Sequence, residues 1–465
     1  AAMGRRGVVL TPGNYGGQFI SGHFHLNGAP VVFISNFVGD AIDCCVREGF
    51  TNVLLVGHIG KLVKVAGGIM DTHSRTADCR AEILAAHAAL ASAGAKTVHE
   101  IMSSVTTTTA LEVIEAAGVG DAVRASLAAA IEDRLRRRAA GACDIAAVVF
   151  DAERREVRRA ALAYVIMMHV GFALLLIGFV RLDSVCGSAD FALLGEYFRT
   201  QPALPLFVVF LAGFGMKAGM FPMHVWLPEA HPAAPSHVSA LMSGVMIKTG
   251  VYGILRVTAA LGEQPLLHTA GVILLAAGVV TGLWGVILAA MQNDVKRLLA
   301  YSSIENVGVI LIGLGVAALG KSSGNQLVAL CGVTGALLHT LNHSLFKSLL
   351  FFGAGNILSQ THTTSLDALG GLAKHMPLTA ILFLTGTAAI CALPPLNGFV
   401  SELLIYLGML DGIASGSDVL ASAAGLAALA LIGGVVILTF TKLYGTVFLG
   451  APRTHEVAEA SEVDN

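Results

Sequence analysis

The stretch that decides the fold is LLHTLNHSLFKSLLFFGAGNIL, residues 337–358, in which most side chains are apolar. Two histidines and a lysine interrupt it at every fourth position, namely His339, His343 and Lys347. At 100° per residue, successive members drift by only about 40°, so all three lie on one helix face over roughly 12 Å. An apolar run of this length with ionisable groups on one face predicts a membrane-spanning helix with a functional role.

The chain around this stretch divides into two unlike parts. Its 465 residues are 55% hydrophobic and 13% charged, whereas a soluble domain carries about 25% charged residues. Residues 1–159 hold 17 Lys/Arg and 16 Asp/Glu, while the longer remainder holds only 12 and 15. This contrast predicts a soluble globular unit followed by a lipid-embedded one. The formal net charge of −2 argues against a nucleic-acid partner.

The first part, residues 1–150, alternates short apolar strands with amphipathic helices. Strand-like runs occur at 52–56 and 145–150, and helix-like runs at 78–93 and 121–138. This alternation predicts an α/β module with parallel strands. The seven cysteines form no CxxC pair and have no metal-binding spacing to histidine, so we expect reduced thiols and no metal site.

After a basic junction at 151–160, the apolar runs are long enough to cross a bilayer, which takes about 20 residues per helix. We expect an all-α polytopic membrane bundle over 161–450 and an acidic tail at 451–465. Two runs are too long for simple helices, and one of them contains Pro394-Pro395, which predicts a break. The bundle should contain about eight helices: 161–180, 204–227, 236–259, 269–291, 298–319, 327–358, 378–410 and 419–449.

Basic residues predict the orientation of the bundle, because they gather on the cytoplasmic side of a membrane. One side carries Arg154, Arg155, Arg158, Arg159, Lys296, Arg297, Lys374 and Arg453. The other side carries only Arg181, Arg199 and Lys321. We therefore expect a multi-pass protein of the bacterial inner membrane with its N-terminal module in the cytoplasm.

Other ionisable groups also lie inside apolar runs. Lys217 and Lys248 have this position, and Glu402 follows the Pro-Pro break. Such a group costs about 2.5–3.5 kcal/mol at mid-bilayer, so its presence indicates function. With the histidines and Lys347, these groups predict a row along which a proton passes stepwise.

Simpler interpretations compete at several positions. Lys296 and Lys374 lie near helix ends, where lysines snorkel to the interface. His169 and His224 fit structural hydrogen bonding. Glu305 fits either a relay member or an anchor between helices, and the His339/His343 pair has no third ligand that would make a metal site.

The same residues carry a family resemblance. The motifs are KAGMFPMHVWLPEAHPAAPSHVSALMSGVMIKTGVYGI (217–254), NDVKRLLAYSSIENVG (293–308), the 337–358 stretch and LPPLNGFVSELLIY (393–406). Over about 290 residues the chain resembles the antiporter-like membrane subunits of respiratory complex I and membrane hydrogenases, most closely the large membrane subunit of hydrogenase-4 and formate hydrogenlyase. The resemblance implies a non-catalytic, proton-translocating subunit of an NADH:quinone oxidoreductase-like complex. Its implied translocation axis is Lys217, Lys248, His339, His343, Lys347 and Glu402, with Lys296, Glu305 and His224 as further candidates.

The resemblance to the antiporter-like subunits also implies partner subunits and further helices for the bundle. Its partners would be other membrane subunits and iron–sulfur, hydrogenase or quinone-reductase subunits, with no cofactor in the bundle itself. Family members have roughly five more helices before 161–180, including a glutamate that pairs with the lysine matching Lys217, and the hydrogenase relatives continue beyond 419–449.

The first part resembles a different family. TPGNYGG (11–17), SNFVGDAID (35–43) and VLLVGHIGKLVKVAGGIMDTHSRTADCRAEILAAHAAL (53–90) are similar to the C-terminal half of cobalt-precorrin-5B methyltransferase of cobalamin biosynthesis. That resemblance implies S-adenosylmethionine as cofactor and a corrin substrate. The ligand-site candidates are Asn14, Asn36, His58, Lys61, Asp71, His73 and Asp78.

The residues of this N-terminal module also allow other interpretations. The Gly57-His58-Ile59-Gly60-Lys61 turn is two residues short of a nucleotide-binding P-loop. Lys61 and Lys64 also fit solvated helix residues, and Asp78 fits a helix N-cap. Three hypotheses therefore stand: a proton-translocating subunit joined to a methyltransferase fragment, an active methyltransferase module, and a fusion of two gene fragments in which neither function is complete.

Overall fold

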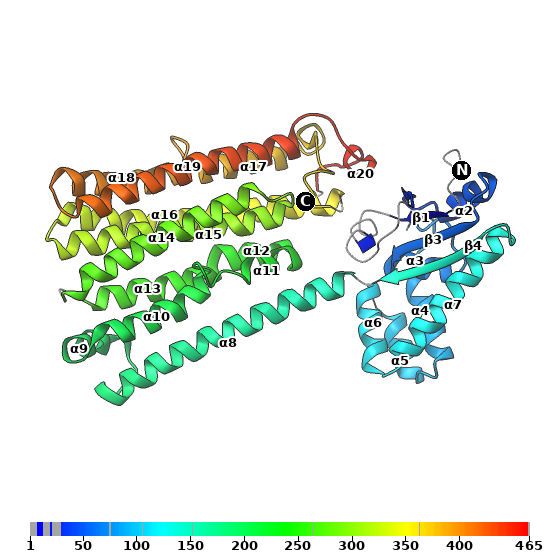
Figure 1. Ribbon diagram of the computed structural model, residues 1–465, viewed down its shortest axis with the longest axis horizontal. Coiled ribbons are helices and arrows are strands. Elements are labelled where there is room, and N and C mark those ends of the chain that lie inside the picture. The colour runs from blue at the N-terminus through cyan, green and yellow to red at the C-terminus, as the bar shows by residue number, and fades with distance from the viewer. Residues whose placement is uncertain are drawn as a thin grey trace. The chain divides into compact units, whose positions relative to one another are not determined.

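The computed structural model describes residues 7–12, 19–20, 29–73, 76–104, 106–150, 152–262, 264–361 and 363–463. The chain forms two compact units, Ala1–Glu156 and Val157–Asn465. The first contains a small sheet with helices, and the second is helical (Figure 1).

In the part of the N-terminal unit that the structure describes, four parallel strands form a sheet in the order β2-β1-β3-β4. Its strands are β1 (Gly7–Thr11), β2 (Val31–Phe33), β3 (Asn52–His58) and β4 (Asp144–Phe150). The central strand β3 is apolar because parallel sheets are covered on both faces, and Leu55 within it is fully buried. The predicted α/β fold with parallel strands is therefore confirmed.

Within the described residues, the helices that accompany this sheet are α2 (Val38–Arg47), α3 (Ile59–Ala66), α4 (Arg80–Leu90), α5 (Ala95–Met102), α6 (Thr107–Ala116) and α7 (Gly120–Ala139). Helix α7 shows how the sequence selects its buried face. Its buried apolar side chains recur at helical spacing, whereas its charged side chains stay exposed or partly exposed. These side chains are Val123, Leu127, Ile131 and Leu135.

The second unit is a bundle of helices. Within the described residues, five are long and apolar enough to cross a membrane: Arg159–Cys186, Ser236–Ala260, Leu266–Ala290, Val295–Ser322 and Val419–Phe448. The elements are α8 (Ala152–Cys186), η1 (Phe191–Leu193), α9 (Leu194–Thr200), α10 (Ala203–Ala218), α11 (Leu227–Ala233), α12 (Ser236–Leu241), η2 (Met242–Met246), α13 (Ile247–Ala260), α14 (Leu266–Ala290), α15 (Val295–Ser322), α16 (Gln326–Thr361), η3 (Leu372–Lys374), α17 (Pro377–Ile390), α18 (Asn397–Ala414), α19 (Val419–Phe448) and α20 (His455–Ala458).

The all-α bundle is confirmed, but the expected number of about eight helices is wrong. Short helices such as α9 and α11 were missed because they are too short to give an apolar run of membrane length. The predicted break in 378–410 is present, since α17 and α18 are separated at 391–396. The 327–358 run, in contrast, is part of one unbroken helix, α16, because it contains no proline.

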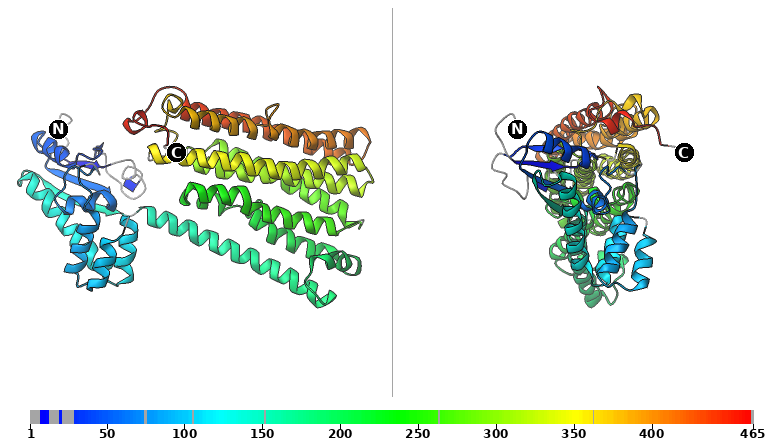
Figure 2. Two further views of the ribbon diagram at one scale, coloured as in Figure 1. Left: turned by 180° about the vertical axis from the view of Figure 1, so that it is seen from behind. Right: turned by 90° about the vertical axis from the view of Figure 1, so that its right-hand side faces the viewer.

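Helix α15 lies at the centre of the bundle. It packs against α14 and α16, and α14 also packs against α19. Figure 2 shows the helices of this unit in two further views. Glycines allow α14 and α15 to approach to backbone contact. A Cβ added at Gly308 would lie 2.4 Å from the backbone nitrogen of Gly282. This close approach fixes the position of the polar groups on α15.

Candidate functional site

The histidine–lysine row of α16 is buried inside the bundle. His339 is 1% exposed, and His343 and Lys347 are fully buried. Helix α16 packs against both α15 and α18, so the groups on this face meet side chains from neighbouring helices rather than lipid. The one-sided arrangement predicted from the spacing places all three groups in the protein interior.

Lys248 joins this row directly. It lies in the first turn of α13, immediately after the π-helical segment η2. Its Nζ contacts Nδ1 of His343 and donates to the Ser243 carbonyl. A hydroxyl contact at 2.8 Å between Ser243 and Ser303 ties the same segment to α15. The structure therefore brings together two residues that are 95 positions apart in the sequence.

His339 contacts a polar side chain with each ring nitrogen. Its Nδ1 lies 3.0 Å from Oγ of Ser401, and its Nε2 lies 3.0 Å from Oδ1 of Asn306. The Ser401 hydroxyl also lies 2.9 Å from the Gly398 carbonyl. Because that hydroxyl has one proton and two acceptors within reach, the pocket accommodates the neutral and the protonated imidazole.

Asn306 extends these contacts to a carboxylate. Its Nδ2 donates to Oε2 of Glu305 and, at 2.7 Å, to the Ser302 carbonyl. Glu305 and Asn306 are both buried on α15. Glu305 is thus connected through one amide to His339, an arrangement that serves a relay as well as an anchor.

Lys347 points toward α15. Its Nζ donates to the Leu299 carbonyl at 2.9 Å and to the Ser302 hydroxyl. The same nitrogen lies 5.8 Å from the centre of the Phe440 ring on α19. The described residues give Lys347 no ion pair, so its partners are a neutral hydroxyl, a carbonyl and a ring face.

The remaining candidates occupy more separate positions. Lys217 lies partly exposed in the last turn of α10, and Glu402 lies on α18 beside Ser401. Within the described residues, neither makes a hydrogen bond or ion pair. Lys296 is buried and donates to the carbonyls of Pro232 and Ala234, so the snorkelling interpretation is wrong for it. His224 accepts a hydrogen bond from Nε1 of Trp284 at 3.1 Å.

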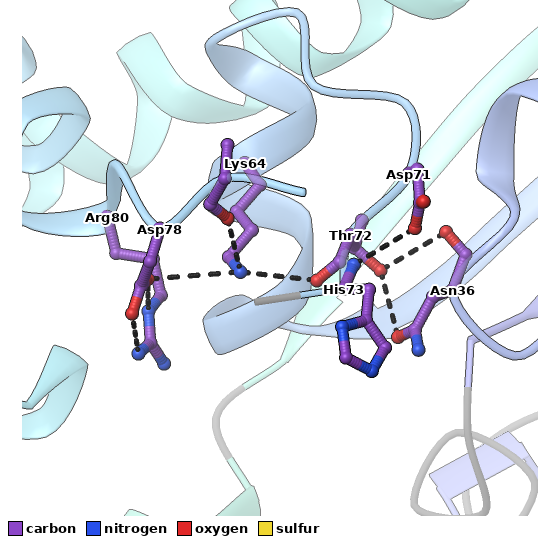
Figure 3. A network of polar contacts seen from close by, with 8 residues as sticks. Asn36, Lys64, Asp71, Thr72, His73, Asp78 and Arg80 are labelled. Carbon is purple, nitrogen blue, oxygen red and sulfur yellow. Dashed lines mark hydrogen bonds and ion pairs between the residues drawn. The ribbon is translucent and has the colours of Figure 1, made fainter. Parts of the chain in front are cut away.

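In the N-terminal unit, several candidates surround Lys64 (Figure 3). The buried Nζ of Lys64 donates to the carbonyls of Thr72 at 3.2 Å and Ala77 at 2.9 Å, and lies 3.8 Å from a carboxylate oxygen of Asp78. Lys64 is only 2% exposed, so the interpretation as a solvated lysine is wrong. Burial lowers its pKa, and the nearby Asp78 carboxylate opposes this effect.

Asn36 and Asp71 hold the same segment from the other side. The Thr72 hydroxyl donates to Oδ1 of Asn36 at 3.3 Å. Asp71 accepts from the His73 backbone amide at 3.1 Å and from the Thr76 hydroxyl at 2.8 Å. These two hydrogen bonds, the backbone one first, lower the pKa of Asp71.

The other N-terminal candidates are dispersed. Asp78 binds Arg80 through two hydrogen bonds, which lower its pKa, and it is not the N-cap of α4, a position that Cys79 occupies. His58 caps α3 by accepting from the Gly60 amide at 3.1 Å. Lys61 lies in the first turn of α3, and Asn14 lies outside the described residues.

Sequence reasoning missed the neutral side chains that connect the charged ones. Ser302 and Asn306 stand inside the motif that contains Glu305, and Ser401 directly precedes Glu402. Each is a neutral polar residue within an apolar run. Such a residue does not by itself indicate a functional site when the helix it contacts is unknown. Among the described residues, no group of three or more His, Cys, Asp or Glu side chains is placed to hold a metal ion.

Comparisons with known proteins agree with both resemblances. The family model described as NADH:quinone oxidoreductase/Mrp antiporter, TM matches residues 139–429. The model described as CbiD, C-terminal domain matches residues 71–161.

Among curated proteins, "Hydrogenase-4 component B" of Escherichia coli (strain K12) is 46% identical over 316 residues, which cover 66% of this chain and 46% of the relative. "Formate hydrogenlyase subunit 3" of the same organism is 39% identical over 278 residues, with 59% and 45% covered. The chain thus spans about half the length of these relatives.

Two solved structures share the fold. A chain of the Mrp complex from Dietzia sp. DQ12-45-1b superposes with a TM-score of 0.56 at 22% identity, covering 84% of this chain and 67% of the other. A chain of the membrane-bound sulfane sulfur reductase, an archaeal respiratory membrane complex, gives a TM-score of 0.57 at 27% identity, with 83% and 60% covered.

Proposed function

Because the chain belongs to the NADH:quinone oxidoreductase/Mrp antiporter transmembrane family, we propose that its membrane unit translocates protons in a hydrogenase-4- or complex I-type membrane complex. One observation carries this proposal above the others. The ammonium of Lys248 and the imidazole of His343 contact each other inside the bundle, where two like charges side by side would be costly. The pair is therefore suited to hold a single shared proton.

The neighbouring groups extend that pair in both directions along α16. His339 and Lys347 lie one helical turn on either side of His343, a spacing of about 6 Å. Internal water would bridge such a step. A proton that reaches one group changes the charge felt by the next, which couples the sites. The Ser401, Asn306 and Ser302 contacts hold the side chains in position while charge moves.

Lys217 and Glu402 are further members of the proposed pathway. We propose that each acquires its partner in the assembled complex, where other membrane subunits and an iron–sulfur hydrogenase or quinone reductase would supply the driving reaction. Relatives named as components of hydrogenase-4 and formate hydrogenlyase support this assignment. We place the protein in the bacterial inner membrane, with the N-terminal unit in the cytoplasm.

Translocation by the assembled, reconstituted complex tests this function. Lys217→Ala and Lys347→Ala should each abolish proton movement into proteoliposomes while leaving assembly intact. Lys321→Ala is the matched control, since Lys321 lies exposed in the last turn of α15 and its loss should leave transport unchanged. Full transport by both Lys217→Ala and Lys347→Ala would refute the proposal.

A second candidate function concerns the N-terminal unit. We propose that it binds a cobalt-corrin and takes part in methyl transfer from S-adenosylmethionine. The match to the CbiD C-terminal domain supports this, and so do the polar groups held around Lys64. Titration of the full chain with a cobalt-corrin, followed by absorbance, should show saturable binding, and its absence would contradict the proposal. The mass of the native protein will show whether both units occupy one polypeptide.

A further inference from the structure

His231 has an unusual environment inside the bundle. It lies on the short helix α11 and is fully buried. Within the described residues, neither of its ring nitrogens has a hydrogen-bond partner. Its ring stacks on Phe351 of α16, with the centroids 4.8 Å apart and the planes 18° from parallel. Stacking occupies a ring face and leaves both nitrogen edges available to water.

A space-filling role does not account for this side chain. A buried polar group that lacks a hydrogen bond costs about 1–3 kcal/mol, and a phenylalanine would fill the same space without that cost. Buried polar groups of this kind are usually satisfied by internal water. The two nitrogens of His231 therefore point to water on both sides of the ring.

The position of His231 continues the row on α16. Phe351 follows Lys347 by four residues, the same interval that separates His339, His343 and Lys347. His231 thus stacks on a side chain that lies one helical turn, about 6 Å along the helix axis, beyond Lys347.

The other side of α11 leads toward the surface. Glu229, two residues before His231, accepts from Arg297 at 2.7 Å, and both side chains are partly exposed, at 36% and 42%. Lys296 fixes the segment that follows by donating to the carbonyls of Pro232 and Ala234. The Ser239 hydroxyl donates to the His231 carbonyl at 2.9 Å. Helix α11 thus carries the His231 imidazole, which stacks on the helix of the buried row, and, two residues earlier, the carboxylate of an ion pair that meets solvent.

We propose that His231 is the proton carrier that connects Lys347 to the aqueous surface beside the Glu229–Arg297 pair. Water on one side delivers a proton to the unprotonated ring nitrogen, which forms an imidazolium. The opposite nitrogen then releases its proton to water on the other side, and the ring is neutral again in its other tautomer. Rotation of the ring restores the starting tautomer, so only N–H bonds of the ring and O–H bonds of water are made and broken. This inference rests on the proposed translocation function.

Three variants of the assembled complex separate this role from a structural one. His231→Phe keeps an aromatic ring against Phe351 but removes both nitrogens. It should lower the initial rate of proton uptake by about tenfold or more, while the thermal midpoint stays the same or rises. Phe351→Leu removes the stacking partner and keeps the imidazole. It should lower the thermal midpoint and retain most of the uptake rate.

His231→Gln provides the deciding comparison if His231→Phe does not assemble. Glutamine still hydrogen-bonds to water but does not carry a proton, so uptake should fall as it does for phenylalanine. Uptake at the wild-type rate in either His231 variant would overturn the inference. Lys347→Ala tests the underlying function separately: loss of transport there, combined with full transport in the His231 variants, would reject His231 alone.

Discussion

Gly308→Ala tests whether the contact between α14 and α15 positions the buried site. The added Cβ would lie 2.4 Å from the nitrogen and 2.6 Å from the Cα of Gly282, and 2.7 Å from the Gly278 oxygen. All three atoms belong to the backbone, so no side chain can rotate away. Since ordinary contacts begin near 3.4 Å, the two helices must separate locally by about 1 Å.

The expected cost follows from overpacking. Forcing an extra methyl into a packed interior costs about 1–3 kcal/mol, although alanine gains about 1 kcal/mol over glycine in helix propensity. The displacement also reaches the proton pathway. Asn306 lies two residues from Gly308, and its 3.0 Å contact with His339 would stretch beyond hydrogen-bonding range after a shift of this size. We therefore expect both stability and proton uptake to fall.

Gly434→Ala is the matched control, because a Cβ added at this position on α19 meets nothing within 4 Å. It gains the same helix propensity without a clash, so it should keep or raise the thermal midpoint in detergent. The two variants should differ by about 1–3 kcal/mol in unfolding free energy. A Gly308→Ala protein as stable and as active as the control would show that the close helix contact does not position the site.

The remaining predictions concern contacts at the edges of the two units. Asp71 and Asp78 have lowered pKa values in the folded chain, so the stability they contribute is complete above the ordinary carboxyl pKa of about 3.9 and disappears as pH falls through the folded values. Hydrogen-exchange protection in the 71–78 segment of the full chain should therefore decrease at acid pH, and constant protection would contradict this. Lys64→Met leaves the Thr72 and Ala77 carbonyls without their charged donor and should lower the urea midpoint of the N-terminal unit by an amount equivalent to about 1–3 kcal/mol. Glu462→Ala removes the carboxylate that accepts from the Leu378 and Thr379 amides at the start of α17, which should cost about 0.5–2 kcal/mol and accelerate exchange of both amides. Unchanged exchange would mean that this cap contributes nothing.

Periodicity explains why the sequence was informative about the row on α16. His339, His343 and Lys347 repeat at a spacing that only a helix converts into one face, and the structure buries that face. The break near Pro394 was equally predictable, because proline cannot continue a helix. Both inferences depend on neighbours in sequence, where local physical chemistry is sufficient.

Contacts between distant segments could not be predicted in the same way. The Lys248–His343 contact depends on how α13 packs against its neighbours, and the role of Asn306 depends on which face of α15 meets α16. Lys64 shows the same limit in the N-terminal unit. Its sequence surroundings fit an exposed helix residue, but Thr72 and Ala77 each place a backbone carbonyl at its ammonium group.

Because α16 is continuous, it limits which motions can control the individual steps of proton transfer. Its 36 residues form a rod of about 54 Å, and a helix of this kind is stiff along its axis. The distances between the backbone positions of His339, His343 and Lys347 are therefore fixed, and a motion of α16 moves all three residues together. Individual steps between them can be opened or closed only by side-chain rotation, by the arrival of water, or by movement of the neighbouring segments. Two of these segments depart from a regular α-helix, namely the π-helical η2 before Lys248 and the 391–396 interruption before Glu402.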